Sequence, residues 1–275
     1  MFDWRWQIKD RKLRFNFPLI VGILNLTPDS FYSQSRCEGR SSALRRAKKL
    51  VSEGADILDL GAESTRPGAE FVSEEEEIAR LLPALEEIRA AFPDIPISVD
   101  TRRGMVAKEA IEAGADIIND VSSLSDPLML EVAAHYLPGL ILTHAPNELA
   151  SGQDRDFSMG EVKKYLRERT SRVVGLGVPR DAIVWDPGLG FGKTPDCNWR
   201  LLTDLKELTA DSLVMCAASR KRFTRRDPDA PESPSNSGLP GTIKAHTIAM
   251  ENGAAMLRVH DVAEAKKLLK GGLRV

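Results

Sequence analysis

The sequence predicts an α/β protein with a single-domain (β/α)8 barrel, also called a TIM barrel, and three observations support this fold class. Short runs rich in Val, Ile and Leu recur along the chain, and segments with helical periodicity separate them. Each run is apolar almost to its end, as expected for parallel strands that are covered on both faces. Eight such runs fall within about 250 residues, which is the usual size of this barrel. A doubly wound open sheet is the alternative that the pattern leaves open.

The composition indicates which partners and which cellular compartment to expect for the protein. Of the 275 residues 42% are apolar, and the net charge of −2 gives no indication of a nucleic-acid or membrane partner. The three cysteines are far apart in the sequence, which fits reduced thiols better than disulfides or a zinc site. No apolar run reaches the roughly 18 residues that span a bilayer, and the first residues contain no signal segment. We therefore expect a cytoplasmic protein.

The elements follow one another along the chain. Residues 1–17 predict a short hairpin that closes the bottom of the barrel. The predicted strands cover 19–25, 57–62, 96–101, 117–122, 139–144, 182–188, 212–219 and 256–261. The predicted helices cover 41–54, 73–92, 129–137, 161–177, 201–208, 242–254 and 263–271. Ser73 and Glu76 form a capping-box pattern, and Pro83 predicts a kink. Residues 225–241, rich in Pro and Ser, predict a mobile loop inside the one domain, 1–275.

Every predicted strand becomes polar where it ends. The residues concerned are Asn25, Glu63–Ser64–Thr65–Arg66, Asp100–Thr101, Asn119–Asp120, His144, Asp186, Ser219–Arg220–Lys221 and Arg258–His260–Asp261. A single aspartate after a strand is usually a helix cap or another structural residue. In this barrel, however, all strand ends meet at one mouth, where active sites lie. So many polar groups in one place favour a binding site, because unmatched buried polar groups are costly.

Two subsites can be separated by chemistry. Asp100, Asn119 and Asp186 are rich in hydrogen-bond acceptors and suit a heterocycle with several N–H donors. Arg66, Arg258 and His260, with Asn25 beside them, form a cationic set suited to phosphate or pyrophosphate. The chain contains neither a P-loop nor a GxGxxG fingerprint. The glycine-rich run WDPGLGFGK (185–193) predicts a sharp turn that presents Phe191 and Lys193.

Seven motifs in this order and at these spacings closely resemble the dihydropteroate synthase family, pterin-binding enzymes of folate biosynthesis. They are ILNLTPDSF, GAESTRPGAE, ISVDT, IIND, DPGLGFGK, SRK and RVHD, and the resemblance extends from Leu19 to the C-terminus. It implies a transferase that condenses 6-hydroxymethyl-7,8-dihydropterin pyrophosphate with p-aminobenzoate, giving 7,8-dihydropteroate and pyrophosphate by an SN1-like mechanism. It also implies Mg²⁺ as cofactor, a homodimer, and inhibition by sulfonamides at the p-aminobenzoate subsite.

The resemblance assigns roles residue by residue. The pterin ligands would be Asp100, Asn119, Asp186 and Lys221. The pyrophosphate ligands would be Asn25, Thr65, Arg66, Arg258 and His260, with Mg²⁺ on Asn25. The p-aminobenzoate subsite would contain Phe31, Thr65, Pro67, Phe191, Lys221 and Arg222. Asp29, Asp100 and Lys221 would be the catalytic residues, with Asp29 and Asp100 stabilising the pterin cation.

Two departures from the family pattern leave alternatives open. Residues 32–36 read YSQSR where an Asp-Gly-Gly type run is usual, and Arg222 follows SRK where the family commonly has Ser. Arg222 would bind the p-aminobenzoate carboxylate or point to solvent. These departures predict altered sulfonamide sensitivity. The alternative functions are a catalytically silent pterin-binding paralogue and a methyltetrahydrofolate-corrinoid methyltransferase, and the second has no need of the STRPG and SRK motifs.

Overall fold

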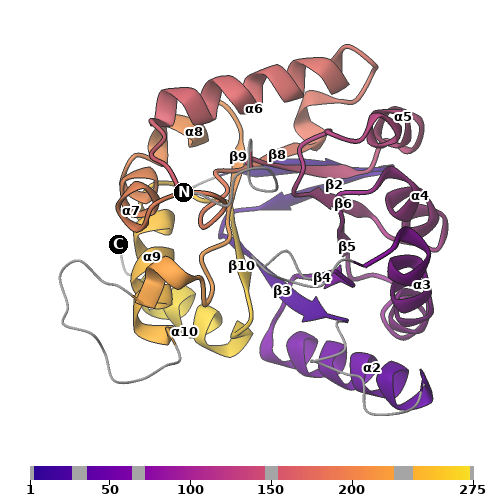
Figure 1. Ribbon diagram of the computed structural model, residues 1–275. Helices are drawn as coiled ribbons and strands as arrows, with labels where there is room; N and C mark the ends of the chain where they lie inside the picture. The colour runs from indigo at the N-terminus through magenta and orange to yellow at the C-terminus, as the bar shows by residue number, and fades with distance from the viewer. Residues whose placement is uncertain (1–2, 27–35, 64–71, 146–153, 226–237, 273–275) are drawn as a thin grey trace.

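A computed structural model describes residues 3–26, 36–63, 72–145, 154–225 and 238–272. Eight parallel strands form a closed barrel, in which β10 pairs with both β3 and β9 (Figure 1). The strands are β3 (Leu19–Asn25), β4 (Ile57–Gly61), β5 (Ile97–Asp100), β6 (Ile117–Asp120), β7 (Gly139–Thr143), β8 (Ile183–Asp186), β9 (Leu213–Cys216) and β10 (Met256–Val259). The predicted (β/α)8 barrel is therefore confirmed, and the open sheet is excluded.

Helices surround the barrel and follow one another around it in chain order (Figure 1). They are α2 (Arg36–Glu53), α3 (Glu74–Ala91), α4 (Gly104–Glu112), α5 (Pro127–Tyr136), α6 (Met159–Val174), α7 (Pro195–Thr203), α8 (Lys206–Thr209), α9 (Leu239–Glu251) and α10 (Val262–Gly272). Two 3₁₀ turns, η1 (Arg180–Ala182) and η2 (Arg222–Arg225), complete the connections. Within these described ranges, none of the helices is long and apolar enough to cross a membrane.

Helix α4 was not among the predicted helices, and its start explains why. It begins after Arg103, whose side chain makes no capping hydrogen bond, so the usual Ser, Thr or Asp signal is missing from the sequence. Helix α3 does carry that signal, since Ser73 Oγ accepts a hydrogen bond from the Glu76 backbone N–H at 3.2 Å. It continues through Pro83 as one helix.

The predicted N-terminal hairpin is present and packs against the bottom of the barrel. Strands β1 (Trp4–Ile8) and β2 (Arg11–Phe15) are antiparallel. Trp6 and Ile8 are fully buried against the residues that begin the barrel strands, among them Ile57 and Met256. Trp6 Nε1 also donates to the Ala182 carbonyl at 2.9 Å. The hairpin thus seals the end of the barrel opposite the mouth.

The predicted loop over 225–241 is shorter than expected at both ends. Arg225 is the last residue of η2, and α9 already begins at Leu239. Pro240 lies in the first turn of α9, where its fixed φ is compatible with a helix and its missing N–H has no helical partner. Residues 226–237 lie outside the described residues.

Candidate active site

The strand register brings the predicted pterin residues to the mouth. Asp100 is the last residue of β5, in register with Gly61 on β4 and Asn119 on β6. Asp186 ends β8 in register with Thr143 on β7. Because parallel strands point the same way, these C-terminal ends share one face of the barrel. Asp100 and Asn119 are therefore neighbours, as the sequence predicts.

Arg258 connects the deep acidic residues across the barrel. Its Nε lies 2.6 Å from Asp59 Oδ2, and its Nη2 bonds to Asp100 Oδ2. The Asn119 amide Nδ2 is 3.5 Å from the same Asp59 oxygen. One guanidinium on β10 thus links β4 and β5, and through Asp59 reaches β6. The sequence placed Arg258 in a separate cationic set, whereas the structure places it among the deep carboxylates.

Asp59 is a site residue that sequence reasoning missed. It lies in the middle of β4 and is 0% exposed, although its neighbours in the strand are apolar. A carboxylate in a buried strand almost always has a charged partner, and this was the available signal. The partner, Arg258, is 199 positions away in the chain, so the pair could not be recognised locally.

Three buried oxygens of this cluster face no donor. Asp59 Oδ1, Asp100 Oδ1 and Asn119 Oδ1 have no hydrogen-bond partner among the described residues. An unpaired buried acceptor costs about 1–3 kcal/mol. Acceptors on three adjacent strands, β4, β5 and β6, suit a planar ligand that carries several N–H donors. The cluster is therefore prepared to accept hydrogen bonds from a ligand.

Burial also changes the acidity of these groups. It raises the pKa of Asp100 above the ordinary aspartate value of 3.8, although Arg258 opposes the shift. Burial raises the pKa of Asp186 as well, against the influence of Lys221. For Arg258, burial disfavours the charge, but Asp59 and Asp100 outweigh it and raise its pKa, so the guanidinium stays charged. The deep subsite thus combines a permanent cation with a carboxyl that keeps its proton to a higher pH than a free aspartate does.

The DPGLGFGK loop brings Lys221 and Phe191 together. Lys221 Nζ donates to the Leu189 carbonyl and lies 4.3 Å from the centroid of the Phe191 ring. Asp186 Oδ1 accepts from the Gly188 N–H at 2.7 Å, which fixes the start of the loop. An ammonium over an aromatic ring is an electrostatically favourable pair. The arrangement gives one wall of the mouth both an apolar and a cationic surface.

The sequence and the fold agree with a known family. Residues 21–260 match the pterin binding enzyme family. The chain is 36% identical to dihydropteroate synthase of Haemophilus influenzae over 262 residues, covering 94% of each chain. The chain belongs to the dihydropteroate synthase family.

Solved structures of the family have the same fold. One is Xanthomonas albilineans dihydropteroate synthase with 4-aminobenzoic acid, with a TM-score of 0.87, 35% identity, and coverage of 98% of this chain and 97% of that one. Another is the Burkholderia cenocepacia enzyme with 7,8-dihydropteroate, with a TM-score of 0.85, 34% identity, and coverage of 98% and 95%. The predicted family, its transferase class and its place in folate biosynthesis are confirmed.

Two residues predicted to bind pyrophosphate are described at the mouth besides Arg258. Asn25 ends β3 in register with Gly61. The backbone of His260 is fixed on both sides, since its N–H donates to Ser219 Oγ at 3.1 Å and its carbonyl accepts from Arg46 Nη2 at 2.8 Å. Five further residues assigned from the family resemblance lie outside the described residues. These are Asp29, Phe31, Thr65, Arg66 and Pro67.

Arg222 departs from the dihydropteroate synthase pattern and lies away from the deep residues. Its side chain is 77% exposed, and its Nη2 bonds to the carboxylate of Asp154. Of the two alternatives that the sequence leaves open, this position matches the one in which Arg222 points to solvent.

His144, another polar residue at a strand end, has a structural environment. Its ring packs edge-on against Phe157 and Tyr165, with centroids 4.9 Å away in each case. Burial, with the positive charge of Lys193 nearby, lowers the pKa of His144 to about 2. The imidazole is therefore neutral at working pH, and it cannot act as a general acid near neutrality.

A second ion-pair network lies beside the mouth, where β4 and β5 lead into their helices. Arg103 contacts both oxygens of Glu63, at 3.0 and 3.1 Å, and also bonds to Glu77, whose side chain is 1% exposed. Its Nη2 donates to the Val72 carbonyl at 2.6 Å. Glu63 precedes residues 64–71 and Val72 follows them, so one guanidinium holds both ends of that segment.

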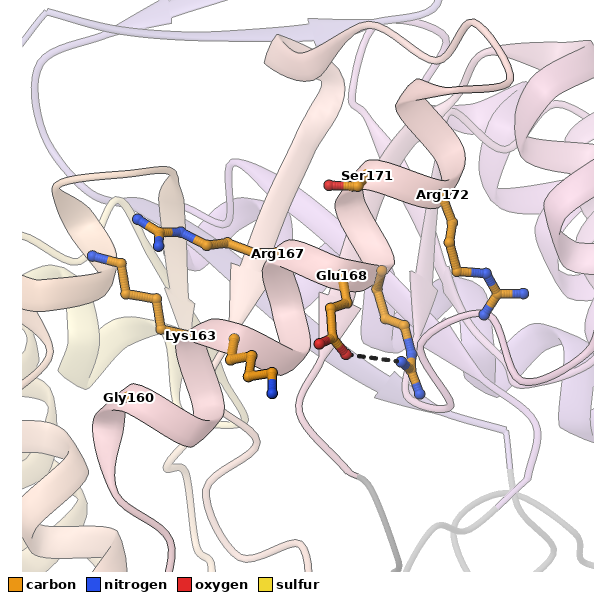
Figure 2. A pocket seen from close by; sticks show the side chains of 8 residues that line it. Gly160, Lys163, Arg167, Glu168, Ser171 and Arg172 are labelled. Atoms are coloured by element: carbon orange, nitrogen blue, oxygen red, sulfur yellow. Dashed lines mark ion pairs between the residues drawn. The ribbon is translucent and has the colours of Figure 1, made fainter.

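The hollow in Figure 2 lies elsewhere, along the outer face of α6. It has a volume of about 640 Å³ and is lined by Gly160, Lys163, Lys164, Arg167, Glu168, Arg169, Ser171 and Arg172. Its charges are largely paired, with Lys163 and Arg167 on Asp211 and Arg169 4.0 Å from Glu168. A helix face of this kind is solvated surface, and we assign no dihydropteroate synthase chemistry to it.

Metal ligation by the protein alone has no support in the ranges that the structure describes. There, no group of three or more His, Cys, Asp or Glu side chains could hold a metal ion. Mg²⁺ commonly takes one or two protein ligands together with substrate phosphates and water. The amide oxygen of Asn25, at the end of β3, is compatible with that second kind of site.

Proposed function

We propose that this chain condenses 6-hydroxymethyl-7,8-dihydropterin pyrophosphate with p-aminobenzoate at the barrel mouth, giving 7,8-dihydropteroate and pyrophosphate. The observation that carries this proposal is the set of three unpaired buried oxygens on Asp59, Asp100 and Asn119. Arg258 holds the two carboxylates among them. The pterin ring presents several N–H donors on one edge, which match these acceptors. The names of the relatives support the same substrates.

The pterin would lie deep in the barrel. Asp100 and Asn119 would accept its N–H groups, and Asp186 on β8 would contribute a second carboxylate. The Arg258 guanidinium, bonded to Asp100, would present a flat cationic surface to the pterin, and Lys221, bonded to the Leu189 carbonyl, would lie on the side of the loop. We assign pterin binding to Asp100, Asn119, Asp186 and Lys221, with Asp59 and Arg258 as the groups that hold Asp100 in place.

The pyrophosphate would lie further out, near Asn25, Arg258 and His260, with Thr65 and Arg66 as additional ligands. Bound Mg²⁺, held by Asn25 and the phosphate oxygens, would supply positive charge for the leaving group. Arg258 is suited to contact both the pterin ring and the pyrophosphate, because it lies beside the deep carboxylates and its charge is permanent. Its position supports a site in which pterin and pyrophosphate are held by one continuous network.

The reaction would break the bond between the pterin methylene carbon and the pyrophosphate oxygen before the new C–N bond forms. The electron pair leaves with pyrophosphate, and the pterin ring delocalises the positive charge. The nearby carboxylates of Asp100 and Asp186 would stabilise that charge as it develops. Asp29 would act from the segment after β3, and Lys221 would orient the pterin. The neutral arylamine then attacks and releases a proton to solvent or pyrophosphate, so no dedicated base is needed.

The p-aminobenzoate would enter along the wall formed by Phe191 and Lys221. Phe31, Thr65 and Pro67 would complete this subsite, and sulfonamides would compete for it. The exposed position of Arg222 supports a minor role for its guanidinium, so we attribute any altered sulfonamide response chiefly to residues 32–36. One domain, a homodimer and a cytoplasmic location remain part of the proposal.

The deciding experiment measures pyrophosphate release by the purified protein with the pterin pyrophosphate and Mg²⁺, with and without p-aminobenzoate. Release that requires p-aminobenzoate and yields dihydropteroate would support the proposal. Pterin binding without turnover would instead indicate the silent paralogue. Methyl transfer from methyltetrahydrofolate to a corrinoid, without pyrophosphate release, would identify the methyltransferase alternative.

A further inference from the structure

The loop between β8 and α7 is folded around the side chain of Lys193. Lys193 as a residue is 2% exposed, and its Nζ donates to three backbone carbonyls. The acceptors are His144 at 2.9 Å, Gly188 at 2.8 Å and Phe191 at 3.2 Å. The sequence predicted that Lys193 would be presented by the turn, but its side chain points inward. A buried ammonium needs such acceptors, so the loop and the charge hold each other in place.

The backbone at Gly188 passes very close to the carbonyl of His144. Gly188 has φ +66°, and a Cβ built there would lie 2.0 Å from the His144 carbonyl oxygen. No other residue fits this contact. Lys193 can therefore reach both the end of β7 and the start of the loop with one ammonium.

Asn198 on α7 restrains the same loop from its other side. Its Oδ1 accepts from the Gly190 N–H at 2.7 Å. Its Nδ2 donates to the carbonyls of Lys193 at 3.1 Å and Thr194 at 2.8 Å. The side chain is 1% exposed, so water does not compete for these bonds. The backbone from residue 188 to 194 is thus fixed by two buried side chains.

This fixed backbone carries the groups at the mouth. Leu189 supplies the carbonyl that receives Lys221, and Phe191 supplies the ring 4.3 Å from the same ammonium. Lys193 bonds to the carbonyl of Phe191 itself. The relative position of the Phe191 ring and the Lys221 ammonium therefore depends on Lys193, which lies beneath them.

We propose that Lys193 is a positioning residue for p-aminobenzoate: it sets the Phe191 ring and, through Leu189, the Lys221 ammonium against which the arylamine is placed. This inference rests on the proposed function, because it takes Phe191 and Lys221 as walls of the arylamine subsite. Lys193 itself does not touch substrate. A shift of about 1 Å in a positioning group is enough to reduce the rate strongly, so a loosened loop has a measurable cost.

The test compares Lys193→Met, Lys193→Gln and a matched surface control, Lys164→Met. We expect Lys193→Met to raise KM for p-aminobenzoate about tenfold. KM for the pterin pyrophosphate should rise less, by about threefold. The loop bonds to Lys221 and Asp186, but strands β5 and β6 hold Asp100 and Asn119 independently of it. Lys193→Gln keeps two N–H donors and should recover part of the loss, and Lys164→Met should match the parent. Equal rises in both KM values, or none in a folded Lys193→Met protein, would overturn the proposal.

If Lys193→Met does not fold, the variant Asn198→Ala and a hydrogen-exchange measurement, which needs no activity, test the same proposal. Asn198→Ala loosens the same loop without removing the buried ammonium, and it should show the same selective rise in KM for p-aminobenzoate. Hydrogen exchange of the amides in residues 188–194 should be faster in Asn198→Ala and in Lys193→Met than in the parent, while the N-terminal hairpin is unchanged. Unchanged exchange in the loop would contradict the inference. Absence of turnover in the parent protein would instead refute the proposed function.

Discussion

Arg258 Nε and Asp59 Oδ2 are 2.6 Å apart, and this contact joins the last strand of the barrel to its second strand. The same guanidinium bonds to Asp100, so the position of this predicted pterin ligand depends on Arg258 and Asp59, neither of which was predicted to bind the pterin. The last strand of the barrel thereby holds Asp100 from across the interior.

Asp59→Asn tests this relationship. The amide keeps the shape of the side chain but removes the charge that orients Arg258, so we expect pterin affinity to fall by about tenfold or more. Isothermal titration calorimetry with the pterin substrate, without p-aminobenzoate, measures the change. Asp181→Asn is the matched control, since Asp181 pairs with Lys12 at the surface far from the mouth. Equal affinities for the parent and Asp59→Asn would show that Arg258 needs no second carboxylate.

The raised pKa of Asp100 predicts a pH dependence of binding. The ionised carboxylate accepts the pterin N–H groups, so affinity should fall as pH decreases through the Asp100 pKa. Because burial raises that pKa, the midpoint should lie above the ordinary value of 3.8. Dissociation constants between pH 8 and pH 5 measure this dependence. A flat profile over that range would contradict the assignment.

The same shift has a consequence for stability. A carboxyl whose pKa is higher in the folded state binds its proton more tightly there than in the unfolded chain. Its contribution to stability is therefore lost as pH rises from about 4 through the folded-state pKa. We expect Asp100→Asn to bind pterin poorly and yet to lose less stability between pH 5 and pH 8 than the parent. Thermal melting at several pH values checks the sign, and a steeper loss in Asp100→Asn would refute it.

Arg103→Gln should destabilise the protein by about 3–5 kcal/mol, because it leaves the buried carboxylate of Glu77 without its partner. Burial raises the pKa of Glu77, so the loss should be larger at high pH, where the carboxyl is ionised. Urea unfolding gives the free energy. Arg102→Gln is the control: Arg102 contacts only one Glu63 oxygen, is partly exposed, and should cost less than about 1 kcal/mol. Similar losses for the two variants would mean that Glu77 does not need Arg103.

Arg222→Ser restores the residue that is common in the family. Since the Arg222 side chain is largely exposed and pairs with Asp154, we expect KM for p-aminobenzoate to change less than about twofold. Inhibition by sulfamethoxazole should change equally little. Parallel steady-state assays of the two proteins measure both quantities. A change of fivefold or more would return Arg222 to the p-aminobenzoate subsite.

The sequence was most informative for site residues whose position follows from the topology of the barrel alone. Asp100 and Asp186 end their strands and Asn119 is the last but one residue of β6. Parallel strands in a barrel all end at one mouth, so the grouping of these residues followed from topology. Asp59 lies inside a strand, and only closure of the barrel brings Arg258 to it.

Lys193 shows the same limit of sequence reasoning. One of its acceptors, the carbonyl of His144, is 49 positions away, so its inward direction is a property of the folded loop. Local sequence identified the turn but gave no indication of which lysine of the mouth, Lys193 or Lys221, lies in its interior.

The hairpin at the bottom of the barrel has a consequence for the order of folding. Trp6 is fully buried among side chains that include Met215 and Met256, so residues from both ends of the chain make one cluster. Contacts between such distant positions form slowly, because the long intervening chain must first be closed into a loop. The indole of Trp6 should therefore reach its buried environment only as strand β10 completes the barrel. The fluorescence of Trp6 would report when the barrel closes during refolding.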